Sequence, residues 1–144
     1  MFDSLLRLLM APALIRHDPE AKLALAALMV RVARADGSYD DEERDSIDRV
    51  LAAQFGLVPA AAGILRNEAE TLEADSPDTV RFTRVLKDSF PLEARAKLME
   101  GLWQIVLSDG NRDDDEESLM RLVASLLGLT DVDSALARQR AEKE

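Results

Sequence analysis

The stretch Asp36-Gly37-Ser38-Tyr39-Asp40-Asp41-Glu42-Glu43 separates two segments whose apolar residues recur at helical spacing. A second stretch, Asp109-Gly110-Asn111-Arg112-Asp113-Asp114-Asp115-Glu116-Glu117, separates two further segments of the same kind. Shifting the chain by 73 residues places the first stretch on the second, with aspartate on aspartate, glycine on glycine and glutamate on glutamate. The sequence therefore predicts two copies of one helix–acidic loop–helix unit.

The repeat continues into the flanking helices. At the same shift, apolar residues of the first copy fall on apolar residues of the second, such as Val32 on Ile105 and Val50 on Val123. One residue of slip then aligns Phe55-Gly56-Leu57 with Leu127-Gly128-Leu129. We expect an all-α, compact bundle with an internal pseudo-twofold axis, in which the two acidic loops approach one another.

Proline and glycine fall between the periodic segments, where helices begin and end. This punctuation predicts seven to eight short helices, with starts near Asp18-Pro19, Asp40, Pro59, Ser76-Pro77, Pro91, Asp113 and Thr130. We expect an N-terminal amphipathic helix and linker over residues 1–18, one helical domain over residues 19–137, and a solvated C-terminal tail over residues 138–144.

Composition limits the function. The 144 residues carry 28 acidic and 18 basic side chains, a net charge of −10, which disfavours binding to nucleic acid and favours basic partner proteins or cations. The chain has no cysteine, which is compatible with a cytoplasmic location. His17 is the only histidine and lies in a polar stretch, so a zinc site built on several imidazoles is not expected.

Residues 1–15 are mainly apolar, but Asp3, Arg7 and Pro12 interrupt them, and the apolar run is too short to cross a bilayer. We expect this segment to pack on the domain or on a neighbouring molecule. Peripheral association with a membrane surface is the alternative.

The acidic loops have a structural interpretation that needs no ligand. Asp40 can cap the next helix while Glu43, three residues later, reaches back to it, and Asp113 and Glu116 repeat this spacing. Acidic residues in a first helical turn also meet the positive end of the helix dipole, a gain of about 0.3–1 kcal/mol each.

The second interpretation is a cation site. The spacing of Asp36, Gly37 and Glu43 matches the second half of a calcium-binding EF-hand loop, and the second copy matches in the same way. The earlier ligand positions hold residues such as Val32 and Ile105, so each loop is half an EF-hand at best. The candidate ligands for a weak calcium or magnesium site are Asp36, Asp40, Glu43, Asp109, Asp113 and Glu116.

The chain resembles the TerB-like, tellurite-resistance-associated family. The resemblance rests on Val32-Ala33-Arg34-Ala35-Asp36-Gly37 followed by Glu43, on Leu107-Ser108-Asp109-Gly110 followed by Glu116, and on Val80-Arg81-Phe82-Thr83, and it covers roughly residues 20 to 135. It implies an all-α bundle with an acidic surface suspected of binding metal or partners, and it carries the family's acidic positions onto Asp36, Glu43, Asp109 and Glu116. Tyr39 and Arg112 depart from the family pattern, and Arg112 adds a cation to the second loop.

Three functions remain open from the sequence. The first is a non-enzymatic interaction module in a stress or tellurite-resistance system, whose acidic face docks basic partners. The second is a sensor or buffer of divalent cations. The third is a carboxylate-based hydrolase, which the sequence favours least because it has no nucleophile–base pair and no phosphate-binding loop.

Overall fold

The computed structural model describes residues 19–35, 37, 39–108 and 114–143. This part of the chain forms seven helices and no strand, as the sequence predicts: α3 (Pro19–Arg34), α4 (Asp41–Phe55), α5 (Pro59–Asp75), α6 (Thr79–Ser89), α7 (Leu92–Ser108), α8 (Asp114–Leu126) and α9 (Asp131–Glu142). The predicted N-terminal helix lies outside the described residues. No single described helix is both long and apolar enough to cross a membrane. The helices α4 and α5 meet the criteria of length and hydropathy only when they are taken together, and the chain bends by 114° between them.

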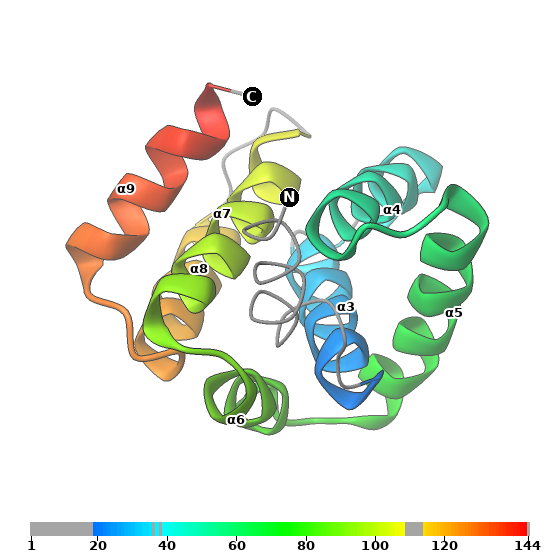
Figure 1. The fold of residues 1–144 in the computed structure, drawn as a ribbon, viewed down its shortest axis with the longest axis horizontal. Helices are drawn as coiled ribbons and strands as arrows, with labels where there is room; N and C mark the ends of the chain where they lie inside the picture. The colour runs from blue at the N-terminus through cyan, green and yellow to red at the C-terminus, as the bar shows by residue number, and fades with distance from the viewer. Residues whose placement is uncertain (1–18, 36, 38, 109–113, 144) are drawn as a thin grey trace, which may run out of the picture.

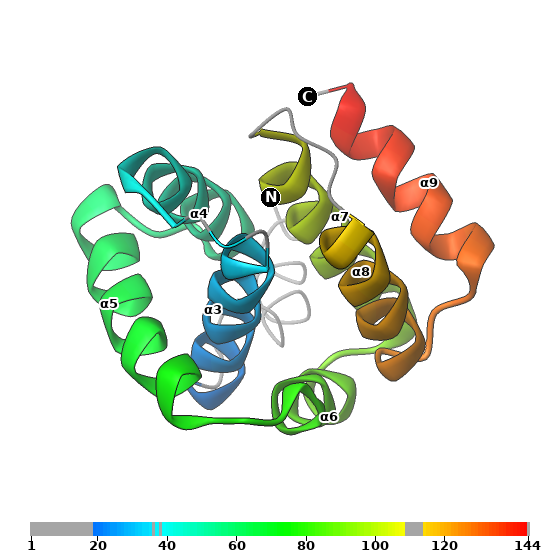
Figure 2. The same ribbon diagram turned by 180° about the vertical axis from the view of Figure 1, so that it is seen from behind.

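The helices form two groups joined by α6. Figures 1 and 2 show α3, α4 and α5 on one side, α7, α8 and α9 on the other, and α6 between them at one end. Within the groups, α5 packs along α3 and α9 packs along α7, while α4 also contacts α7 across the middle. This arrangement has the order that a duplicated unit would produce, but the internal twofold symmetry stays a prediction.

The helix α3 is the centre of the core. Ten of its 16 residues are buried, among them Leu25, Leu28 and Met29, which are fully enclosed. A helix that is apolar around most of its circumference has to be surrounded by others. Here α4, α5, α6, α7 and α8 all contact it.

Several helix ends follow the local sequence rules. Gly56 and Gly128 each adopt a left-handed conformation, with φ of 64° and 77°, after α4 and α8. The next residue in each case, Leu57 or Leu129, donates its N–H to a carbonyl five residues back, at 3.1 and 2.9 Å. This is the hydrogen bond of a Schellman motif, which only glycine accommodates without strain. Thr130 caps α9 through a complete capping box with Asp133.

Two predicted boundaries were wrong. Asp78, not Ser76-Pro77, caps α6, because the Asp78 carboxylate accepts a hydrogen bond from Val80 N at 3.0 Å. The solvated tail predicted from Arg138 does not begin there either. The helix α9 continues to Glu142, Ala141 is buried against the bundle, and Arg138 covers the ring of Trp103 at 5.0 Å.

Trp103 holds α9 against α7. Its indole N–H donates a 3.2 Å hydrogen bond to the Ser134 hydroxyl, which satisfies the one polar atom of an otherwise buried ring. Nearby, the buried carboxylate of Glu100 accepts from Arg140 Nε at 3.3 Å. These contacts explain why the basic end of the chain is helical.

Candidate functional site

The first acidic stretch becomes the capped start of α4. Asp40 has extended backbone and its carboxylate accepts a hydrogen bond from Glu43 N at 3.0 Å, as the capping interpretation predicts. Asp41, Glu42 and Glu43 fill the first turn of the helix. Their charges face the positive end of the helix dipole, which stabilises them there.

Glu43 and Glu116 differ from the other acids because they are buried. Their side chains belong to the third residue of α4 and of α8, and their residues are 7% and 2% exposed. Burying a carboxylate is costly unless it is hydrogen-bonded or paired. The third helical position is where the glutamate of a capping box lies, and Glu43 and Glu116 occupy this matching position in the two helices.

Of the other predicted cation ligands, the structure describes Asp40 alone. Asp36, Asp109 and Asp113 lie outside the described residues. Asp40 is exposed, whereas Glu43 and Glu116 are buried. Among the residues that are described, no three acidic or histidine side chains are grouped so that they could hold a metal ion. The calcium or magnesium site therefore stays a prediction.

Tyr39, in the middle of the first acidic stretch, attaches it to α5. Its hydroxyl donates a 2.6 Å hydrogen bond to Glu70 Oε2. The guanidinium groups of Arg34 and Arg44 lie over its ring at 4.9 and 4.7 Å from the centroid, a favourable cation–π arrangement. In the sequence, Tyr39 stands out only as a departure from the family pattern. The structure shows that it anchors the α3–α4 connection.

Glu70 is the centre of a charge network on this side. Its Oε2 also accepts from Arg66 Nη1 at 2.9 Å and from Arg44 Nε at 3.2 Å, and Arg66 bridges onward to Asp48 at 2.7 Å. Partial burial opposes ionisation of Glu70, but the hydrogen bonds from Tyr39 and Arg66 and the positive charge of Arg66 outweigh it and lower the pKa of this carboxyl group. Arg44 and Arg66 are thus already engaged with acids of the bundle.

Arg31 of α3 binds groups at the end of α5 and at the start of α6. Its Nε contacts Glu73 Oε2 at 3.0 Å, and its two terminal nitrogens donate to Thr79 Oγ1, Glu73 O and Ser76 O. One planar guanidinium therefore ties α3 to both sides of the α5–α6 connection. Nothing in the sequence singled out Arg31 as more important than other arginines.

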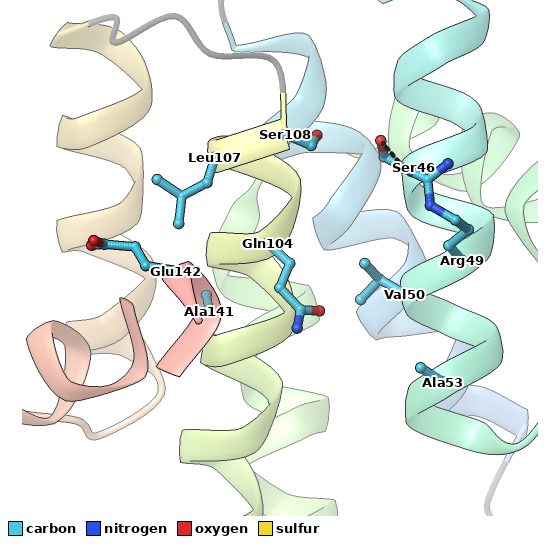
Figure 3. Close-up of a pocket in the computed structure, with 9 residues that line it drawn as sticks. All are labelled: Ser46, Arg49, Val50, Ala53, Gln104, Leu107, Ser108, Ala141 and Glu142. Atoms are coloured by element: carbon cyan, nitrogen blue, oxygen red, sulfur yellow. Dashed lines mark hydrogen bonds between the residues drawn. The ribbon is translucent and has the colours of Figure 1, made fainter. Parts of the chain in front are cut away.

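An open groove lies between α4, α7 and the end of α9. Its volume is about 610 Å³, and Figure 3 shows its lining: Ser46, Arg49, Val50, Ala53, Gln104, Leu107, Ser108, Ala141 and Glu142. Ser46 lies one turn after the first acidic stretch, and Ser108 directly precedes the second. The described residues that flank the two acidic stretches thus border one groove.

Comparison with known proteins gives the family. The model of the family described as tellurite resistance protein TerB matches residues 22–139. The chain belongs to the TerB family. The comparison with curated proteins found no match. A crystal structure of a protein of unknown function from Porphyromonas gingivalis W83 is similar, with 19% identity, 88% of this chain and 90% of that chain covered, and a TM-score of 0.66.

The TerB match confirms the family that the acidic signatures indicated, and the similar crystal structure agrees with the helical fold. Membership links the chain to a family named for tellurite resistance. The acidic positions of the TerB signature, Asp36, Glu43, Asp109 and Glu116, keep their status as predicted ligand or docking residues.

Proposed function

We propose that this TerB protein is a non-enzymatic interaction module of the cytoplasm, whose acidic end docks basic surfaces of partner proteins in a resistance or stress system. The observation that carries the proposal is an excess of acidic side chains where α4 and α8 begin. Eleven carboxylates lie in residues 36–43 and 109–117, out of 28 in the chain.

The charge balance of α4 supports this proposal. Glu42 and Asp45 are exposed and form no ion pair with another described residue. The arginine between them, Arg44, is used by Asp41 and Glu70. Like charges that stay uncompensated within the fold repel one another, and a positive partner surface would relieve that repulsion.

A divalent cation is the second candidate for the positive species. The buried Glu43 and Glu116 favour it, because they occupy matching positions at the starts of α4 and α8 and each would supply a hard oxygen ligand. A calcium or magnesium ion there would need further ligands from Asp36, Asp40, Asp109 or Asp113.

The hydrolase hypothesis gains little from the groove. Of the residues that line it, Glu142 alone is acidic, and it already contacts Arg138 at 3.4 Å. Acid–base catalysis by carboxylates needs two such groups, or one beside a nucleophile, in reach of one substrate.

The test of docking uses oligolysine as a basic probe with no apolar face. The double variant Glu42→Gln/Asp45→Asn should bind oligolysine several-fold more weakly than the native chain in fluorescence anisotropy, and the difference should shrink at high salt. The control is Glu68→Gln/Asp75→Asn, which removes the same charge from exposed positions of α5. Equal weakening by both variants would show that only net charge matters and would contradict a defined acidic face.

Calorimetry with calcium tests the second candidate. A site that uses the buried glutamates should lose its heat of binding in both Glu43→Gln and Glu116→Gln. No heat with the native chain at millimolar calcium would leave protein docking as the remaining proposal.

A further inference from the structure

We propose that the groove between α4, α7 and α9 binds a basic amphipathic helix, which lays its apolar face on the groove and its lysines or arginines against the acidic end of the bundle. This inference rests on the proposed function and names the kind of partner and the place where it binds.

Four of the nine residues that line the groove are apolar, and we call them its floor. Val50 and Ala141 are buried, Leu107 is half-buried and Ala53 is exposed. These small and aliphatic side chains leave room for larger apolar ones. An amphipathic helix fills such a groove with residues spaced three and four apart.

The helices α4 and α7 cross closely near Gly101. A Cβ atom at Gly101 of α7 would lie 2.9 Å from Gln54 Nε2 and 3.1 Å from Val50 Cγ1. Side chains of α4 therefore pack directly against the backbone of α7 at this glycine. Gln54 also donates to Lys97 O at 3.0 Å across the same crossing. Further along, Ser46 and Ser108 line the groove from the two helices, near the acidic stretches. The lining therefore reaches to within one turn of the acidic start of α4.

Helical spacing places acids on the groove face of α4. Glu42 lies four residues before Ser46, and Asp45 lies four residues before Arg49, so both continue the face that lines the groove. Arg49 is the basic side chain in the lining, and it donates to Ser46 Oγ at 3.1 Å. A basic helix would find an apolar floor and acidic groups along one line, with Arg49 as the one unfavourable contact among the lining residues.

This charge pattern selects a basic partner helix over two other occupants. A second copy of this acidic chain would bring like charge to the groove. The N-terminal segment carries Asp3 and Arg7 within residues 1–15, so it offers no excess of positive charge. Both occupants are outcomes that the experiment can detect.

The experiment follows amide resonances of the full-length chain by NMR during titration with a synthetic peptide of leucine and lysine, whose leucines lie on one helical face. A peptide of the same composition, with its leucines scattered around the helix, is the control. We expect the amphipathic peptide to shift Val50, Ala53, Gln104, Leu107 and Ala141, and to bind at least about tenfold more tightly than the scattered one.

Three variants test the groove itself. Ala53→Gln should weaken binding of the amphipathic peptide about tenfold without changing charge, because it places an amide on the apolar floor. Ala60→Gln, an equally exposed alanine on α5, should leave binding unchanged. Arg49→Gln should strengthen binding, because it removes the cation that repels the peptide.

Several results would overturn the inference. Equal binding of both peptides, with shifts confined to the acidic stretches, would leave acidic docking intact but remove the groove from it. Groove resonances that move in Leu5→Asp/Leu9→Asp without peptide would assign the groove to the chain's own N-terminal segment. Resonances that move with protein concentration alone would assign it to a second copy. Failure of both peptides and of oligolysine to bind would overturn the proposed function as well.

Discussion

The Tyr39 hydroxyl and the Glu70 carboxylate are joined by a 2.6 Å hydrogen bond between the α3–α4 connection and α5. The contact spans 31 residues of sequence, and Tyr39 lies within the first acidic stretch, directly before Asp40. It fixes where α4 begins, and thereby where Asp40 to Glu43 are presented. The position of the acidic first turn of α4 thus depends on the pairing of Tyr39 with Glu70 of α5.

Replacing Tyr39→Phe should lower the free energy of unfolding by about 1.5 kcal/mol, the usual loss for a hydrogen bond to a charged acceptor. The ring remains between Arg34 and Arg44, so Tyr39→Leu, which also removes the cation–π contacts, should cost more. Urea unfolding of the three proteins measures the difference. Equal stability of the native chain and Tyr39→Phe would show that the hydrogen bond contributes nothing.

Glu70 should make stability depend on acid. Its pKa is lowered in the fold from an ordinary value of 4.5, so the ionised form is stabilised in the native state. The stabilisation is complete above pH 4.5 and is lost as pH falls through the lower pKa of the folded chain. Unfolding measured from pH 7 down to pH 3 should show a shallower decline for Glu70→Gln than for the native chain. The exposed Glu68→Gln should decline like the native chain.

Tyr39 should resist ionisation in alkali. Burial, and then the hydrogen bond to Glu70, raise its pKa above the ordinary value of 10.0. The native state keeps the phenol proton, so this stabilisation is present below pH 10 and is lost as pH rises through the raised pKa. Tyr39 is the only tyrosine, so tyrosinate absorbance reports it directly. Titration of the folded chain at the ordinary value would contradict the buried contact.

Arg31→Lys should lower the free energy of unfolding by about 2 kcal/mol although it keeps the charge. A lysine ammonium cannot reproduce the planar fork that reaches the Glu73 carboxylate, the carbonyls of Glu73 and Ser76, and Thr79 together. Arg84→Lys, at an exposed position of α6, is the matched control and should change stability little. Thermal unfolding followed by circular dichroism compares them.

Gly56→Ala and Gly128→Ala should differ in cost. Both residues have positive φ, where an alanine loses about 1–2 kcal/mol. A methyl group at Gly56 meets open space, whereas one at Gly128 lies 2.8 Å from Arg95 Nη1 and displaces a side chain that binds the carbonyls of Phe90 and Leu127. Urea unfolding should rank Gly128→Ala as the less stable variant. The same loss in both would mean that only the backbone conformation matters.

Local rules were enough to place most helix ends. The Asp40 cap, the Thr130 capping box and the glycines after α4 and α8 each depend on residues close in sequence, and the structure has them where the sequence predicts. The buried state of Glu43 and Glu116 was not predicted. It depends on which helices cover the first turns of α4 and α8, and spacing carries no such information.

Contacts between residues far apart in the sequence account for the other features of the structure that were not predicted. The tail beyond Arg138 has few apolar residues, and it is helical because Trp103 and Glu100 of α7 receive Arg138 and Arg140. Arg31 and Arg34 pair across the bundle with Glu73, because α3 runs beside α5, and this contact between distant residues has no signal in the local sequence.

The position of Trp103 gives the molecule a built-in optical reporter. It is the only tryptophan, and it lies between α7 and α9 with Arg138 over its ring. Its emission therefore follows the half of the bundle that contains α7, α8 and α9, and responds little to α4 or α5. If the half formed by α3 to α5 unfolds first, the helical ellipticity falls while the tryptophan emission stays native. If the unfolding curves from ellipticity and from tryptophan emission coincide, the bundle unfolds as one cooperative unit.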